Sequence, residues 1–349
     1  MSNPAVTPTP LAEMMKKQHR GKLSLEKFIT LAALFALLII FSVTAKNFFT
    51  VRNVLTMALQ TSTITLMGIG VTFVIITGGI DLSIGSVVAL TGTCAVLVAN
   101  TGVPSWLAML IGVFVGALCG YGNGLLVTKL RLPPFIATLG TMMIFRGLVL
   151  TITNANSASA PDDFGHLAND NLFKVLHHNS DGSTSVVFPG ISSIVLIMIV
   201  LALLFAFILK MTKTGRYTYA IGSNEEASRL SGIHVSRVKV YNYIFCGFLA
   251  GVVGILLASR MVTSQPNGGI GYELNAIAAS VIGGTSLMGG VGTVGGTVIG
   301  SFIIGVLGTG LTMQGANYFA QQIVIGSVLI VAVAVDQLRN RPRRAKGNR

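Results

Sequence analysis

The sequence predicts an all-α integral membrane protein with about ten transmembrane helices, some of them broken or re-entrant. Three observations support this class. Hydrophobic residues make up 52% of the 349 residues and charged residues only 10%, whereas soluble domains carry roughly 25% charged residues. Apolar runs of bilayer length recur along the whole chain. Basic residues gather in clusters between these runs, as the positive-inside rule describes.

Ten apolar runs are candidates for the membrane helices, because a helix needs roughly 20 apolar residues to cross the hydrocarbon core. The run near 274–288 is short and ends in the glycine-rich string LMGGVGTVGG, so it could be a half-helix or a re-entrant segment buried in protein. The first run could instead be a signal peptide, because SVTA before Lys46 is similar to a cleavage site. The runs span about 28–45, 54–77, 83–100, 105–127, 135–153, 189–209, 240–259, 274–288, 294–312 and 318–336.

The distribution of charge predicts the orientation of these helices. Basic clusters occupy 1–27, 211–239 and 339–349, whereas 154–188 holds four aspartates and a single lysine. We therefore expect both chain ends and the loop 211–239 to be cytoplasmic, and 154–188 to lie outside. One polytopic domain, 28–338, lies between the two basic ends. The net charge of +13 is concentrated beside membrane segments, so we expect membrane lipid and no nucleic acid as a partner.

Glycine recurs in two kinds of pattern. Gly112, Gly116, Gly120 and Gly124 stand at i, i+4 spacing, which lets membrane helices approach closely. The strings GGIDLSIG and GGTSLMGG, at 78–85 and 283–290, look alike, either as an internal repeat or by chance in a chain with 41 glycines. Broken helices are common where a substrate path is lined. Candidates for the translocation pathway or a hinge in these strings are Asp81, Ser83, Gly283 and Gly284.

Few ionisable residues lie within the apolar runs, and charge in hydrocarbon is costly. We interpret Asp81 first as a helix N-cap, a role compatible with a polar hinge at the inner mouth of a pathway. Arg146 lies inside a predicted span and is a further pathway candidate. It could extend toward the outer surface, or pair with a carboxylate or a helix C-terminus. No metal site is expected, because adjacent His177 and His178 do not supply three or four ligands.

The cytoplasmic loop contains a short predicted helix. Ser223 or Asn224 can cap its N-terminus, and Glu225 and Glu226 then fall in the first turn, where the helix dipole favours acids. Gly232 is well placed to end it. The sequence therefore predicts a helix of one to two turns that projects from the membrane.

The catalytic motifs that are absent also constrain function. No GxxxxGK[ST] phosphate loop, HExxH zinc pair or GxSxG nucleophile elbow occurs in the chain. We therefore expect no catalytic residues and no cofactor, and an energy source that is a separate subunit. Buried carboxylates, which ion-coupled carriers usually need, are nearly missing. The alternatives left open are a standalone secondary carrier or facilitator for a small polar solute, and an intramembrane enzyme.

Four strings together resemble the permease subunit of ribose-type bacterial ABC importers, in a collinear match over roughly 28–338. The resemblance implies a homodimer of permease chains in the bacterial inner membrane, a tandem-cassette ATP-binding subunit and a periplasmic sugar-binding protein. It also implies a fold similar to that of the vitamin B12-type importer permeases. The substrate would be a monosaccharide, ribose or a related sugar. The strings are ITGGIDLSIGSVVALTG, PPFIATLGTMMIFRG, GRYTYAIGSNEEASRLSGIHVSRVKVYNYIFCGFLAG and GYELNAIAASVIGGTSLMGG.

In such importers the cytoplasmic helix is the coupling helix that contacts the ATPase. Two registers of its motif fit this chain: Glu226, Ala227 and Ser228 with Gly232, or Glu225 as the acidic anchor. The residues that the resemblance places at the coupling helix are Gly222, Asn224, Glu225, Glu226, Ala227, Arg229 and Gly232.

Overall fold

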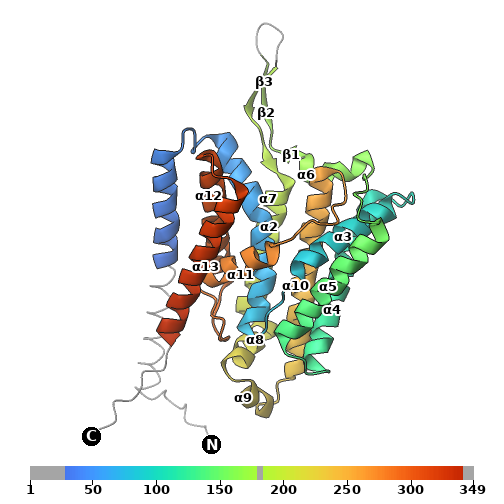
Figure 1. Ribbon diagram of the computed structural model, residues 1–349, viewed down its shortest axis with the longest axis vertical. Coiled ribbons are helices and arrows are strands. Elements are labelled where there is room, and N and C mark those ends of the chain that lie inside the picture. Colours follow the sequence, from blue (N-terminus) through green and yellow to red (C-terminus); the bar gives the residue numbers. More distant parts are fainter. Residues whose placement is uncertain (1–27, 179–183, 341–349) are drawn as a thin grey trace, which may run out of the picture.

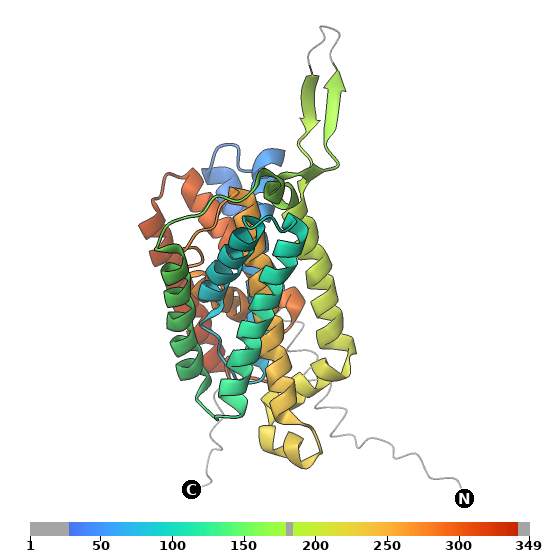
Figure 2. The ribbon, with the colours of Figure 1, turned by 90° about the vertical axis from the view of Figure 1, so that its right-hand side faces the viewer.

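The computed structural model describes residues 28–178 and 184–340. Long helices run side by side, strands β2 and β3 project from one end of the bundle, and the short helices α8 and α9 lie at the other (Figures 1 and 2). Within the described residues, every predicted apolar run contains a helix. Six helices are long and apolar enough to cross a membrane: α2 (Val51–Ile76), α4 (Ser105–Thr128), α5 (Pro134–Thr153), α7 (Ser193–Met211), α10 (Val235–Met261) and α12 (Val294–Met313).

Four further apolar helices are shorter or less apolar. One of them, α11, has 11 residues and is about 16 Å long, half of the roughly 30 Å hydrocarbon core. It ends at Ile282, earlier than the predicted run, because the glycines that follow have no helical preference. These helices are Phe28–Thr44, α3 (Ile84–Ala99), α11 (Tyr272–Ile282) and α13 (Tyr318–Asn340), whose apolar part is Tyr318–Ala334.

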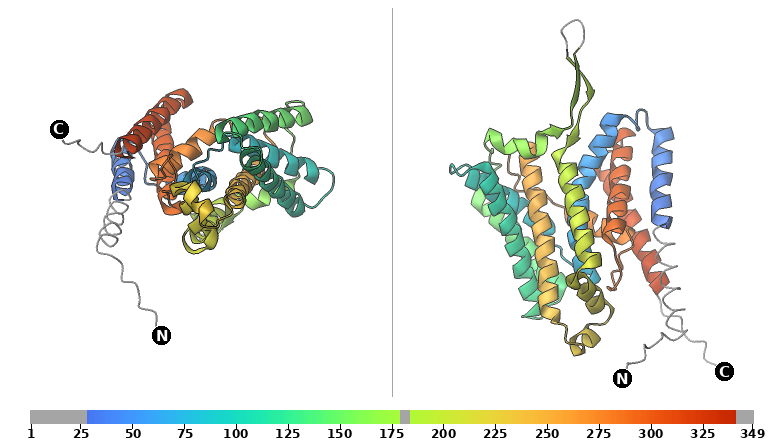
Figure 3. Two further views of the ribbon diagram at one scale, coloured as in Figure 1. Left: turned by 90° about the horizontal axis from the view of Figure 1, so that it is seen from below. Right: turned by 180° about the vertical axis from the view of Figure 1, so that it is seen from behind.

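Helix α2 is the centre of the bundle. Of its most apolar membrane-length window, 83% is buried, compared with 22% for α5 at the periphery. Seen from below, α2 lies among the other helices (Figure 3). Because α2 is surrounded by protein, its side chains can include many buried threonines and serines without contacting lipid.

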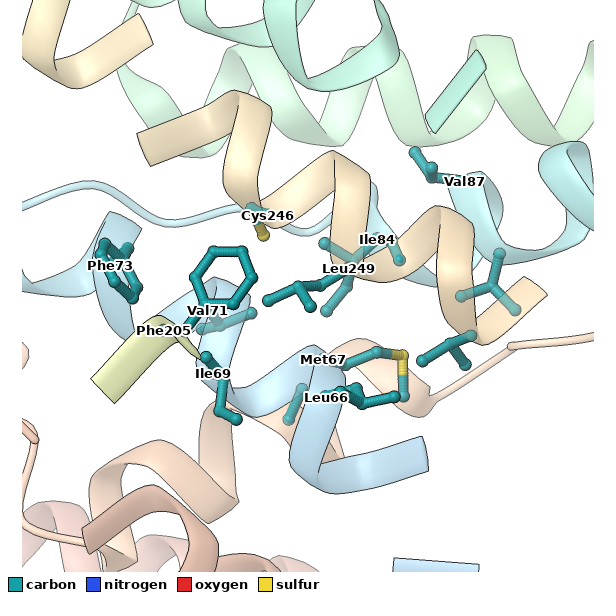
Figure 4. Close-up of a cluster of buried hydrophobic side chains, with 14 of the residues drawn as sticks. Leu66, Met67, Ile69, Val71, Phe73, Ile84, Val87, Phe205, Cys246 and Leu249 are labelled. Carbon is teal, nitrogen blue, oxygen red and sulfur yellow. The ribbon is translucent and has the colours of Figure 1, made fainter. Parts of the chain in front are cut away.

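The apolar core joins α2 to α3, α7 and α10 (Figure 4). Phe73 of α2 makes edge-to-face contacts with Phe205 of α7 and Phe245 of α10, at ring-centroid distances of 5.7 and 5.6 Å. Aromatic pairs in this geometry contribute about 0.5–1.5 kcal/mol beyond area burial. Cys246 is a free thiol within the same core, as expected of a small apolar residue.

The glycines at i, i+4 spacing pack α4 against α10, as predicted. A Cβ on Gly120 would collide with the carbonyl oxygen of Tyr243, and one on Gly116 would lie 2.8 Å from the Cα of Gly251. Gly122, on the same helix, has open space where its Cβ would be. The spacing therefore marks a backbone contact between two helices.

The segment 154–188 holds structure that the sequence reasoning did not anticipate. Short antiparallel strands pair β1 (Asn171–Leu172) with β4 (Ile191–Ser192), and β2 (Val175–His178) with β3 (Thr184–Phe188). The run TSVVF in β3 is rich in β-branched and aromatic residues, which favour extended backbone. A 3₁₀ turn, Asp162–Gly165, and the one-turn helix α6 (His166–Asn169) precede the strands.

The substitution Gly120→Ala should lower the apparent melting temperature of the detergent-solubilised chain, since overpacking a helix contact costs roughly 1–3 kcal/mol. Gly122→Ala is the matched control. It should leave the melting temperature unchanged or raise it slightly, because alanine is the better helix former. Thermal denaturation followed by size-exclusion chromatography measures both. Equal behaviour of the two variants would contradict the close packing of α4 on α10.

Candidate functional site

The coupling region predicted from the sequence consists of two short helices, α8 (Lys213–Ser223) and α9 (Glu225–Leu230). Of the two capping candidates, Asn224 is the N-cap of α9: its Oδ1 accepts the backbone N–H of Ala227 at 2.9 Å. The Ser223 hydroxyl instead donates to the Tyr219 carbonyl within α8, at 2.9 Å. A single non-helical residue, Asn224, thus separates the two helices.

Helix α9 ends at Leu230, with Ser231 as its C-cap, and Gly232 terminates it from the next position, as predicted. This glycine has a φ of +81°, in the left-handed region that glycine adopts without steric cost. Its N–H donates to the carbonyl of Arg229 at 3.0 Å, and the N–H of Ile233 donates to that of Ser228 at 3.1 Å. These two bonds form a Schellman motif, which satisfies the last carbonyls of the helix.

The two glutamates of α9 have different environments. Glu225 forms ion pairs with Arg229 at 3.2 Å and with Lys239 of α10 at 2.6 Å. Glu226 is exposed and forms no ion pair among the described residues. Beside it, Ala227 is exposed, and Leu230 is 85% exposed. Glu225 therefore ties α9 to the bundle, while Glu226, Ala227 and Leu230 form an outward face.

Helix α8 contacts the end of α2, just before the first glycine-rich string, and the last glycine of the second string. A Cβ on Gly222 would collide with the Ile76 carbonyl at the end of α2 and with the Gly290 amide. The Gly290 N–H in turn donates to the Ile76 carbonyl at 2.8 Å. This three-way contact joins α8 to the residues before GGIDLSIG and to the last glycine of GGTSLMGG. Figure 1 shows α8 beneath the lower end of α2.

Tyr219 makes a second contact from α8 to the same region. Its hydroxyl donates to the Gly292 carbonyl at 2.6 Å. Burial raises the pKa of Tyr219 to about 12. Two residues of one short helix, one turn apart, therefore hold the segment 290–292.

The first break is the non-helical segment 77–83, between α2 and α3. Asp81 lies there in a buried polar cluster. Its carboxylate accepts the backbone N–H of Ser83 at 2.9 Å and the Ser83 hydroxyl at 2.7 Å. The Asn123 amide of α4 donates to the Ser83 hydroxyl at 2.7 Å. The N-cap of α3 is Ser83 rather than Asp81, so the N-cap interpretation of Asp81 is wrong. The aspartate instead closes a local turn with Ser83, immediately before the helix, as Asx side chains commonly do.

Arg146 bonds to backbone, not to a carboxylate or a helix C-terminus. Its guanidinium donates to the carbonyls of Pro266 at 2.6 Å and Gly268 at 2.9 Å, and to that of Gly85 at 3.4 Å. The side chain therefore fastens the loop before α11 to the first turn of α3. None of these partners belongs to the coupling region, so Arg146 is structurally separate from α8 and α9.

The second break is the non-helical segment 283–293, between α11 and α12, and it is closely packed. Backbone atoms of Gly296 in α12 lie where a Cβ of Gly283 would be, and Gly284 has a φ of +90°. Next to it, the Thr72 hydroxyl of α2 lies 2.8 Å from that of Ser280 in α11 and 2.6 Å from that of Thr297 in α12. Sequence reasoning missed this triad. Its signal was the presence of hydroxyl residues in otherwise apolar runs.

Comparison with known proteins identifies the class. The model of the family described as "Branched-chain amino acid transport system / permease component" matches residues 53–333. The chain belongs to this permease family. It is 41% identical over 308 residues to the ribose import permease RbsC of Escherichia coli K12, covering 88% of this chain and 92% of that one. Bacillus subtilis RbsC is 40% identical over 316 residues, covering 90% and 94%.

The similarity extends to other sugars. The xylose transport permease XylH of E. coli K12 is 34% identical over 367 residues, covering 91% of this permease and 93% of XylH. These relatives are named as transport permeases and not as enzymes. The chain is accordingly a transport permease, and its six bilayer-length apolar helices make it a multi-pass membrane protein.

Removing the α9 cap should loosen the coupling region of the permease. Asn224→Ala deletes the acceptor for the Ala227 N–H. This change should lower the stability of the helix by about 1 kcal/mol, which raises the population of its locally unfolded state about fivefold. Trypsin should therefore cut after Arg229 about five times faster, as followed by mass spectrometry of the fragments. Ser223→Ala is the control, because that hydroxyl bonds only within α8. Equal cleavage of the two variants would contradict the capping assignment.

Proposed function

We propose that the chain is the membrane-spanning permease subunit of an ATP-driven importer of a monosaccharide, ribose or a related sugar. The observation that carries the proposal is the similarity to ribose import permeases from three bacterial genera, at 39–41% identity over about nine-tenths of the chain. The D-allose permease AlsC, at 36%, and xylose XylH, at 34%, are less similar. Ribose is therefore the first substrate to test.

The finer architecture belongs to the same proposal. We expect the ten apolar helices to form the membrane domain of a vitamin B12-type importer permease, with α11 entering the membrane without crossing it alone. Both termini and the α8–α9 pair would be cytoplasmic, and the strands β1 to β4 periplasmic. The basic composition of 211–239 and the acidic composition of 154–188 support this orientation. The basic segment 1–27 and most of the tail 339–349 lie outside the described residues.

The proposed assembly has two copies of this permease, a tandem-cassette ATP-binding subunit and a periplasmic sugar-binding protein. Helix α5 supports pairing of two copies, because few of its residues are buried within one chain. Its exposed apolar residues are available to a second copy or to lipid: Phe135, Ile136, Met143, Ile144, Leu148 and Ile152.

In the proposed mechanism the ATP-binding subunit contacts the outward face of α9, formed by Glu226, Ala227 and Leu230. Motion passes to α10 through the Glu225–Lys239 ion pair. It passes to both glycine-rich breaks through the contacts of α8. The transporter then alternates between inward-open and outward-open states. ATP drives this change only because the cassettes bind one state more tightly than the other.

Reversing the charge of Glu226, on the outward face of α9, should uncouple ATP hydrolysis from sugar uptake. With Glu226→Lys we expect ribose uptake by the reconstituted assembly to fall at least about tenfold, since a like-charge or unpaired contact at an interface costs more than 1.4 kcal/mol. ATP hydrolysis should continue, and the melting temperature of the permease should change little, because Glu226 has no ion pair in the described chain and loses only a helix-dipole interaction of under about 1 kcal/mol.

Two controls accompany this experiment. Asp163→Lys makes the same charge change at an exposed site in the segment 154–188 and should leave uptake intact. Liposomes that hold only the permease, without ATP, should not take up ribose. Uptake by the permease alone would overturn the proposed function in favour of a standalone carrier, and normal uptake by Glu226→Lys would overturn the role of α9.

A further inference from the structure

A groove of about 840 Å³ opens beside the coupling helix. One side is the turn between α4 and α5, another is the start of α10, and α9 forms the third. It is distinct from the outward face of α9, because it lies on the side where Glu225 points toward α10.

The groove carries a strong excess of positive charge. Four basic side chains and a single carboxylate line it. The carboxylate, Glu225, is already shared by Arg229 and Lys239. The other two cations, Arg131 and Arg237, are exposed and form no ion pair among the described residues. Two arginines, one from the α4–α5 turn and one from α10, thus lack a counter-charge, and an anion bound in the groove would supply it.

Arg131 is also held in an unusual backbone conformation. Its φ is +54°, in the left-handed region, which is sterically strained for a residue other than glycine. The turn therefore presents a cation to the groove at a position where glycine would be less strained. Helices α5 and α10 both begin at the groove, without side-chain caps. The positive ends of their dipoles add to the potential of the arginines.

Apolar side chains line the groove beside the charged ones. Val127, Leu132, Ile233 and Val235 contribute to the lining, together with two prolines. Next to these lining residues in the sequence, Leu130 is 65% exposed and Phe135 is 50% exposed. A small soluble anion needs no apolar surface. A molecule with a phosphate at one end and hydrocarbon at the other matches both parts.

The position of the groove along the bundle agrees with such a molecule. The apolar span α4 ends here at Thr128, and the spans α5 and α10 begin at Pro134 and Val235. The ends of apolar spans mark the level of lipid headgroups. Basic pockets between membrane helices at this level are suited to anionic lipid headgroups.

We propose that this groove binds the phosphodiester headgroup of an anionic phospholipid, with Arg131 and Arg237 as the principal phosphate contacts. The lipid would neutralise the groove and hold the α4–α5 turn next to α9 and α10. The proposal depends on the helix ends lying at the membrane surface. It does not depend on the identity of the transported sugar or on the ATP-binding subunit.

Native mass spectrometry of the full chain in detergent, with equimolar phosphatidylglycerol and phosphatidylcholine, tests this directly. Wild-type chain should retain phosphatidylglycerol preferentially. In the double variant Arg131→Gln with Arg237→Gln, the preference for phosphatidylglycerol over phosphatidylcholine should fall about tenfold. Each basic residue near the membrane surface contributes several-fold to the affinity for an anionic lipid. The matched control, Lys210→Gln with Lys213→Gln, removes two exposed cations nearby but outside the groove. It should keep the preference.

Three outcomes would overturn the proposal. The first is equal retention of the two lipids by wild-type chain, and the second is an equal loss in the groove and control variants. The third is release of the lipid by millimolar inorganic phosphate or by addition of the ATP-binding subunit, which would make the groove a soluble-anion site or a protein interface. Circular dichroism of each variant separates lost binding from lost folding. Because no uptake is measured, failure here leaves the proposed transport function untouched.

Discussion

The contact of Gly222 with the Ile76 carbonyl and the Gly290 amide is the constraint on which the rest of the account depends. At this point three segments far apart in sequence approach so closely that a side chain larger than hydrogen does not fit. One segment is the end of the central helix α2, one follows α11, and one belongs to the coupling region. A rigid backbone contact transmits displacement without a flexible side chain between the parts. Movement of α8 must therefore move both breaks or break this contact.

The interior next to this contact is polar but almost without charge. Hydroxyl groups of Thr72, Ser280 and Thr297 join α2, α11 and α12, and Asp81 is satisfied by Ser83 at the first break. The three hydroxyl residues are fully buried and bond to one another, so they join the helices without the desolvation cost of a buried charge.

Much of the fold could be predicted from the sequence, because membrane helices are marked by local composition. Each apolar run contains a helix, the glycine stripe of α4 packs on α10, and Asn224 and Gly232 bound α9 through local backbone chemistry. The errors have two sources. Asp81 was interpreted as a helix cap, whereas it forms a turn with Ser83, two residues away, and both arrangements are local and fit the same sequence. The different environments of Glu225 and Glu226 and the bond of Tyr219 depend on Lys239 and Gly292, whose positions follow from tertiary packing that no local pattern encodes.

The contact of Gly222 with Ile76 and Gly290 is tested most directly by hydrogen–deuterium exchange of the assembled importer, with and without ATP, under conditions that block hydrolysis. The account predicts that exchange in 77–83 and in 283–293 changes together when ATP binds. In Gly222→Ala, where the added Cβ forces α8 away from both segments, that joint response should be lost. Gly295→Ala, which has open space for a Cβ, should behave like the wild type. A response confined to one segment, or an unchanged response in Gly222→Ala, would contradict the account.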